Sequence, residues 1–303
     1  MTPAPIDVEL AGFDGTRLRG ELHRPRGDAP FPAVVMTHGF SATAAMGLAP
    51  FARALCDAGI AVLVYDHRNL GRSDGEPRGE INPWAQMRDQ RRALDWLAAR
   101  EDVDAARLGV WGTSFSGGEA LILAACDRRV RAVVANVPFA ALAPSYPDAD
   151  ARFAATRDAL LDESDDALSV RARVRTGPIA VVVEPGREMR AYLPQPESTE
   201  WFLASGARAG AGWRNEVDVV NAFGTDPSFD PGPCVEHVAP TPVLFVVASE
   251  DRLAATALAL AAFERAREPK RLVVIEGHHF APYAGEALEV ASGAARDHFV
   301  AHL

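Results

Sequence analysis

The chain has 303 residues, of which 48% are hydrophobic and 24% charged, a composition typical of a soluble globular protein with ample material for a core. Its formal net charge of −10 argues against surfaces that bind nucleic acid or anionic membranes, because both need basic patches. No segment approaches the roughly 18 apolar residues that span a bilayer, and the N-terminus lacks the basic and apolar regions of a signal peptide, so we expect a cytoplasmic protein.

The first 137 residues alternate between predicted strands and predicted helices. Residues 6–23 predict two antiparallel edge strands with a turn at Asp14-Gly15. Apolar strands are predicted at 31–37, at 60–66, beginning at 108, and at 130–137. Helices are predicted at 47–58, at 82–100, and beginning at 120. The strand at 31–37 is continuously apolar, which indicates burial on both faces of a parallel sheet. The alternation predicts an α/β fold with a mostly parallel, doubly wound sheet.

This alternation of strands and helices is interrupted between the sixth and seventh predicted strands. We interpret residues 140–237 as a cap or lid inserted into a core formed by 1–139 and 238–303. The insertion predicts helices near 150–161, 198–205 and 215–221 and a strand near 179–183. Its aromatic side chains favour a packed element over a disordered linker; they are Tyr146, Phe153, Trp201, Phe202, Trp213 and Phe223.

The alternation resumes after the insertion. Strands are predicted at 242–248 and 271–275, with a helix at 254–267 between them and a last helix from about 285. These elements extend the parallel sheet, and ligands of such sheets bind at the carboxyl ends of the strands.

A serine at one of these ends is the leading nucleophile candidate. The short apolar segment from Leu108 leads into Gly112-Thr113-Ser114-Phe115-Ser116 and then an apolar helix, which predicts a sharp strand-turn-helix with Ser114 at its tip. The usual pattern is G-x-S-x-G, and Ser116 occupies the place of the second glycine. Ser116 is a rival nucleophile, but only Ser114 has a glycine two residues before it and a strand running straight into it.

A serine hydroxyl needs a base and an orienting carboxylate. Ser249-Glu250-Asp251 follows the strand at 242–248, and His278-His279 follows the strand at 271–275. The order of serine, acid and histidine is that of the α/β-hydrolase arrangement.

The sequence resembles the α/β-hydrolase superfamily, near dienelactone hydrolases, acetyl xylan esterase-like proteins and X-Pro dipeptidyl-peptidases. The matching stretches are Thr37 to Phe40, Tyr65 to Pro77, Trp111 to Gly118, Pro240 to Asp251 and Gly277 to Tyr283. The resemblance implies Ser114 as nucleophile, Asp251 rather than Glu250 as acid, and His279 rather than His278 as base. It also implies an oxyanion hole made by the backbone N–H groups of Phe40 and Phe115.

Other polar residues near these motifs have plainer interpretations. We expect His38 to shape a loop, and Asp66, His67 and Arg68 to form a structural turn. Glu119 is interpreted as a helix-start glutamate favoured by the helix dipole. Three cysteines, Cys56, Cys126 and Cys234, lack metal-ligand spacing and are expected to be buried thiols.

The leading functional hypothesis is a serine hydrolase that cleaves a carboxylic ester or thioester through an acyl-enzyme on Ser114, with no cofactor and no metal. The alternatives are an amidase, peptidase or biosynthetic acyltransferase, and, less favoured, a binding protein of the same fold without turnover. The expected partner is a small-molecule ester or acyl substrate in a pocket lined largely by the insertion. A homodimer is suggested only by the resemblance.

Overall fold

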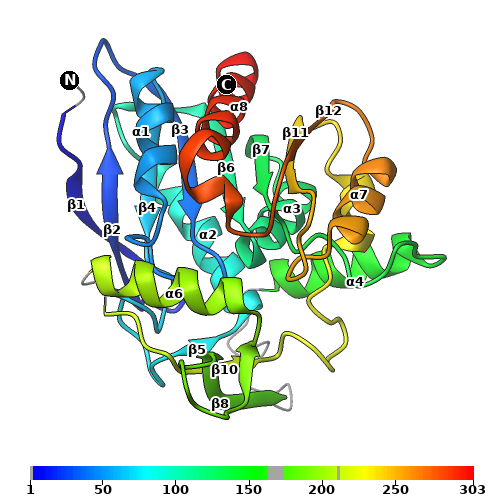
Figure 1. Cartoon of the computed structure of the whole chain (residues 1–303). Coiled ribbons are helices and arrows are strands. Elements are labelled where there is room, and N and C mark those ends of the chain that lie inside the picture. The colour runs from blue at the N-terminus through cyan, green and yellow to red at the C-terminus, as the bar shows by residue number, and fades with distance from the viewer. Residues whose placement is uncertain (1–2, 163–173, 210–211) are drawn as a thin grey trace.

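The computed structural model describes residues 3–162, 174–209 and 212–303. Its centre is an eight-stranded sheet with the strand order β1-β2-β4-β3-β6-β7-β11-β12 (Figure 1). These strands are β1 (Ile6–Ala11), β2 (Arg17–His23), β3 (Phe31–Thr37), β4 (Ala61–Tyr65), β6 (Val103–Thr113), β7 (Val130–Asn136), β11 (Val243–Ala248) and β12 (Lys270–Ile275). β1 and β2 form an antiparallel edge, and all neighbours from β4 to β12 pair in parallel. The predicted edge hairpin and parallel sheet are confirmed.

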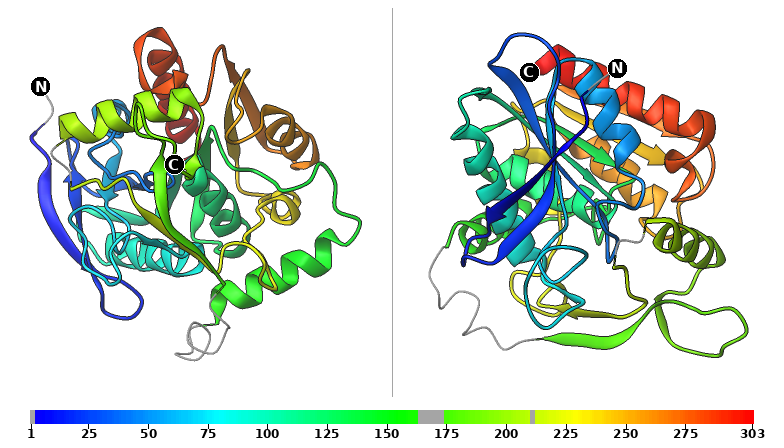
Figure 2. Two further views of the ribbon diagram at one scale, coloured as in Figure 1. Left: turned by 60° about the horizontal axis from the view of Figure 1, so that its bottom comes forward. Right: turned by 90° about the vertical axis from the view of Figure 1, so that its left-hand side faces the viewer.

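Helices cover both faces of this sheet (Figure 2). One face carries α1 (Ala49–Asp57) and α8 (Gly285–His302), and the other carries α2 (Pro83–Ala98), α3 (Phe115–Cys126) and α7 (Thr256–Arg265). Successive residues of β3 point to opposite faces, since Val34 packs with α1 and α8 whereas Val35 packs with the helices of the other face. This burial on both faces explains why the strand is continuously apolar.

The segment between β7 and β11 has two parts. The first comprises α4 (Ala149–Leu161) and the 3-10 helix η1 (Gly232–His237), which contact each other and α3. The second comprises β8 (Arg175–Val182), β9 (Ala191–Leu193), α6 (Pro196–Ala209) and β10 (Val217–Val220). In Figure 1, α6 and the strands of this second part lie below the main sheet, where the carboxyl ends of its parallel strands are found.

The three strands of the second part form a four-stranded sheet with one strand from the core, in the order β5-β10-β8-β9. Its first strand, β5 (Glu80–Ile81), precedes α2 and pairs in parallel with β10. The helices predicted at 150–161 and 198–205 and the strand at 179–183 are confirmed. The helix predicted at 215–221 is wrong, because this stretch holds β10, whose Val-Asp-Val-Val sequence is rich in β-branched residues and pairs on both sides.

A short 3-10 helix, η2 (Ala281–Tyr283), connects the loop after β12 to α8. Within the described residues, no helix combines the length and apolarity that crossing a membrane requires.

The start of α2 provides a test of local stability. Asn82 is the N-cap, and its side-chain oxygen accepts hydrogen bonds from the N–H groups of Trp84 (3.1 Å) and Ala85 (3.4 Å). We expect Asn82→Ala to lower the free energy of unfolding by about 1 kcal/mol, because two helical N–H groups lose their acceptor. Asn82→Asp keeps that acceptor and is the matched control. Urea unfolding followed by circular dichroism measures the difference, and equal midpoints for both variants would contradict this account.

Candidate active site

Ser114 is located at the sharp turn that joins β6 to α3. Its backbone has φ 56° and ψ −118°, a left-handed conformation that a residue with a Cβ rarely adopts. The turn depends on close approach, because a Cβ on Gly112 would lie 2.0 Å from the carbonyl oxygen of Ser116. The predicted strand-turn-helix around Ser114 is therefore confirmed, and Gly112 is required by this close contact.

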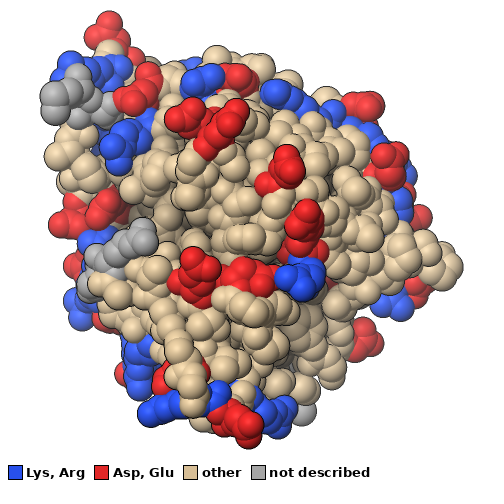
Figure 3. All heavy atoms as spheres, in the orientation of Figure 1, with Lys and Arg blue, Asp and Glu red and all other residues tan. Residues whose placement is uncertain are grey.

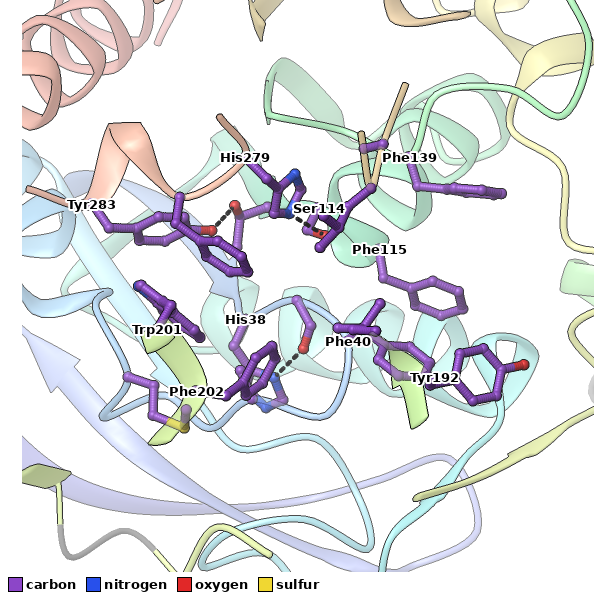
Figure 4. A pocket seen from close by; sticks show the side chains of 18 of the residues that line it. His38, Phe40, Ser114, Phe115, Phe139, Tyr192, Trp201, Phe202, His279 and Tyr283 are labelled. Carbon is purple, nitrogen blue, oxygen red and sulfur yellow. Dashed lines mark hydrogen bonds between the residues drawn. The ribbon is translucent and has the colours of Figure 1, made fainter. Parts of the chain in front are cut away.

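A chain of two hydrogen bonds links three of the predicted residues, and Figure 4 shows the first of them, between Ser114 and His279. The Oγ atom of Ser114 lies 2.9 Å from His279 Nε2, and His279 Nδ1 lies 2.6 Å from Asp251 Oδ2. Asp251 follows β11 and His279 follows β12, so segments far apart in sequence meet at one edge of the sheet. The 2.9 Å separation is within the range in which a base accepts a proton from a nucleophile.

Asp251 is held as a carboxylate by its surroundings. Its side chain is buried, and burial acts to raise the pKa of Asp251. The hydrogen bond and charge of His279 oppose that effect, together with the N–H groups of Ala254 and Leu253, which donate to Oδ1 at 2.8 Å. The net result is a lowered pKa, so Asp251 carries a negative charge beside the imidazole at neutral pH.

The rival residues lie elsewhere. Ser116 is buried on the inner side of α3, where its hydroxyl donates to Glu119. Glu250 is exposed, while His278 Nδ1 accepts a hydrogen bond from the N–H of Phe280. The structure thus brings together Ser114, Asp251 and His279 but not their sequence neighbours.

The backbone N–H groups of Phe40 and Phe115 lie in the two segments that meet at Ser114. Among the described residues, neither group donates a hydrogen bond to the protein. The loop that carries Phe40 touches the nucleophile, since a Cβ on Gly39 would lie 2.9 Å from Ser114 Cβ and 3.5 Å from Ser114 Oγ. Both N–H groups therefore belong to segments that adjoin Ser114 and have no acceptor among the described residues.

A cavity of about 250 Å³ opens onto Ser114 and His279. Its walls are largely aromatic, as Figure 4 shows, and comprise Phe40, Phe115, Phe139, Tyr192, Trp201, Phe202, Phe223, Phe280 and Tyr283 among others. None of the described residues that line it is Asp, Glu, Lys or Arg. The cavity therefore suits an uncharged, apolar group bound beside the serine.

The origin of this lining corrects one expectation. Most lining residues belong to the core, so the insertion does not supply most of the pocket; it contributes Tyr192, Leu193, Gln195, Trp201, Phe202 and Phe223. Of the other aromatic residues of the insertion, Phe153 stacks on His237 and Tyr146 hydrogen bonds to Asp230. Both support the packing of the insertion and not the cavity.

Sequence reasoning missed several of the lining residues. Phe139 follows β7, and Tyr283 follows the loop that carries His279. Both residues come shortly after the end of a sheet strand, and this position could have indicated that they line the cavity. The hydroxyl of Tyr283 hydrogen bonds to Thr113, directly before the serine. Tyr192 lies on β9, a three-residue strand with no strong sequence pattern.

The polar residues behind the serine also differ in part from expectation. Arg68 pairs with Asp89 and Asp14, which confirms a structural role for its turn. Glu119 is completely buried in the second turn of α3, so its interpretation as a helix-start glutamate is wrong. Its Oε2 atom accepts hydrogen bonds from Gln90 and Ser116, both at 2.7 Å.

The same fold occurs in known hydrolases. The family model described as X-Pro dipeptidyl-peptidase (S15 family) matches residues 14–281. The crystal structure of the α/β hydrolase GrgF from Penicillium sp. sh18 aligns with a TM-score of 0.76 and 27% identity, covering 99% of each chain. The predicted α/β-hydrolase fold is therefore confirmed.

Sequence relatives with functional names include the following three proteins. The quorum-quenching protein AidA of Acinetobacter baumannii (strain MDR-ZJ06) is 37% identical over 45% of this chain and 44% of its own length, so that match spans less than half of either protein. The thiohydrolase aneE of Aspergillus aculeatus is 28% identical over 93% of this chain and 89% of its own. The polyketide transferase af380 of Aspergillus fumigatus is 29% identical over 90% of each.

The buried Glu119 predicts a specific pH dependence of stability. Burial raises the pKa of Glu119 to about 8, against the hydrogen bonds of Ser116 and Gln90, which act to lower it. From about pH 4.3 to pH 8 the unfolded chain releases this proton while the folded chain retains it, so stability falls as pH rises across that window. We expect the melting temperature of the wild type, relative to that of Glu119→Gln, to fall between pH 5 and pH 8.

The matched control is Glu101→Gln, since Glu101 is exposed. Its melting curves should follow the wild type at both pH values. Parallel pH profiles for the wild type and Glu119→Gln would show that Glu119 does not keep its proton in the folded state.

Proposed function

The chain belongs to the X-Pro dipeptidyl-peptidase (S15) family, and we propose that it is a serine hydrolase that cleaves a carboxylic ester or thioester through an acyl-enzyme on Ser114. The observation that carries the proposal is the pair of short hydrogen bonds from Ser114 to His279 and from His279 to Asp251. These two contacts give the serine a base and the base an oriented carboxylate.

In the proposed mechanism, His279 Nε2 accepts the Ser114 proton as Oγ attacks the acyl carbon. The hydrogen bond from His279 Nδ1 to Asp251 fixes the tautomer that leaves Nε2 free to accept, and the carboxylate stabilises the imidazolium that forms. The N–H groups of Phe40 and Phe115 then donate to the oxyanion of the tetrahedral intermediate. Collapse of the intermediate expels the alcohol or thiol, which takes its proton from His279. Water attacks the acyl-enzyme by the same steps and releases the acid.

The cavity favours an ester or thioester over an N-terminal dipeptide as substrate. A dipeptidyl substrate carries a free ammonium group, and a buried cation needs a carboxylate partner. The described lining residues include no Asp or Glu. On the face that Figure 3 shows, a broad area without charged side chains lies above α6, with acidic side chains at its border. The uncharged lining of the cavity supports an uncharged acyl group.

Acyl transfer is the second candidate. It is supported by the apolar walls of the cavity, which disfavour water beside the acyl-enzyme, and by the name of the relative af380. Product masses measured with and without added alcohols or amines separate the two reactions. Acid as the sole product at every acceptor concentration would remove this candidate.

The roles of the two neighbouring histidines provide a direct test. We expect His279→Ala to lower kcat/KM for a p-nitrophenyl ester by at least about 1,000-fold, because the serine loses its base. His278→Ala is the matched control, since His278 has no contact with Ser114, and it should keep most of the activity. Steady-state kinetics on both variants decide the assignment. A large loss in His278→Ala alone would reverse it.

The cavity also predicts a limit on substrate size and charge. A cavity of about 150 Å³ holds a benzene ring, so the 250 Å³ found here accommodates an acyl chain of roughly ten carbon-sized atoms. We expect kcat/KM to be greatest near the octanoyl ester and to fall for longer chains. An octanoyl ester with a terminal carboxylate should react at least about 100-fold more slowly, because the carboxylate loses its hydration when it is buried in the cavity. Comparable rates for the charged and uncharged esters would contradict the assignment of this cavity as the acyl site.

A further inference from the structure

A continuous chain of buried hydrogen bonds runs behind the candidate active site. It starts at the carbonyl oxygen of Gly39, to which His38 Nδ1 is bonded at 3.0 Å. The N–H of His67 donates to His38 Nε2 at 3.0 Å, and His67 Nε2 lies 3.0 Å from Ser116 Oγ. Ser116 Oγ donates to Glu119 Oε2 at 2.7 Å. We call this series, from Gly39 to Glu119, the buried chain.

The donor in each hydrogen bond of the buried chain can be assigned from the neighbouring bonds. When the Ser116 hydroxyl donates to Glu119, His67 carries its proton on Nε2 and donates to Ser116. His38 accepts at Nε2, so it carries its proton on Nδ1 and donates to Gly39. In this arrangement His67 donates in both directions and each further member donates to the next one, and hydrogen bonds in series reinforce one another.

Burial keeps the buried chain uncharged. Its four side chains are at most 1% exposed. Burial lowers the pKa of both His38 and His67, and it raises the pKa of Glu119 to about 8. At neutral pH the two imidazoles and the carboxyl group are neutral, so the geometry does not depend on an ion pair.

The two ends of the buried chain lie in the two segments that carry the proposed oxyanion donors. In a trans peptide the C=O and N–H groups point in opposite directions. Holding the Gly39 oxygen toward His38 therefore turns the N–H of Phe40 away from His38, and Gly39 itself lies against Ser114. At the other end, Ser116 follows Phe115 directly in the first turn of α3.

We propose that the buried chain fixes the separation of the Phe40 and Phe115 N–H groups, and that Ser116 is a positioning residue for them. Ser116 does not touch the substrate; it connects the first turn of α3 to the loop after β3 through His67 and His38. The proposal rests on the proposed serine hydrolase function, because the two donors act on the oxyanion of the tetrahedral intermediate.

The test compares a transition-state analogue with a ground-state ligand. The probe 1,1,1-trifluorodecan-2-one forms a tetrahedral adduct with an activated serine, whereas decan-2-one binds without one. We expect Ser116→Ala to weaken the trifluoroketone and to lower kcat by about 10- to 100-fold, because displaced donors no longer meet the oxyanion. KM and the affinity for decan-2-one should change by no more than about twofold. A purely structural role for Ser116 would weaken both ketones together.

The matched control is Ser73→Ala. Ser73 is also buried and makes two hydrogen bonds, one to the carbonyl of Asp66 and one from the N–H of Arg19, but it is outside the buried chain. Equal trifluoroketone affinity in Ser116→Ala and Ser73→Ala, with an active wild type, would overturn the positioning role alone. A wild type that turns over no ester and forms no adduct with the trifluoroketone would remove the proposed function and this proposal with it.

A second pair of variants tests the buried chain if Ser116→Ala does not fold. Glu119→Gln keeps an oxygen that can accept from Ser116, and we expect its trifluoroketone affinity to remain within about threefold of the wild type. Glu119→Leu removes the acceptor and should lose about tenfold. Equal affinities in these two variants would overturn the proposal.

Discussion

The left-handed backbone of Ser114 is the constraint on which the active site depends. A non-glycine residue in this region costs of order 1 to 3 kcal/mol and persists only where its surroundings determine it. Here the serine is fixed from both sides, since its N–H donates to the Asn136 oxygen at 2.9 Å and its oxygen accepts from the Phe139 N–H at 2.8 Å. Both partners belong to the end of β7 and the residues that follow it, so the neighbouring strand stabilises the turn.

The parallel sheet then determines where the other groups lie. β3, β6, β11 and β12 end at the same edge, and the segments that follow them supply Phe40, Ser114, Asp251 and His279. Asp251 is held by two N–H groups of its own loop, and His279 is held by its hydrogen bond to Asp251. The reactive geometry therefore derives from strands packed on both faces, while α6 and the loop after β10 complete the cavity above it.

The sequence was most informative where local pattern and burial agree. Continuously apolar strands, the Asn82-Pro83 helix start and the glycine-rich turn at Ser114 are local signals, and the structure has these elements where they are predicted. Non-local pairing explains the failures. β10 is a strand because it pairs with β5 and β8, which lie far away in the sequence. Glu119 is buried because Gln90 on another helix faces it, and no spacing within α3 indicates that contact.

Fluorophosphonate labelling of the native protein, followed by peptide mass mapping, tests the central claim most directly, because it requires an activated serine but no knowledge of the substrate. The account predicts a single adduct on Ser114 that is lost after heat denaturation. It would be contradicted by an adduct on Ser116 instead, or by a native protein that is labelled no faster than the denatured chain.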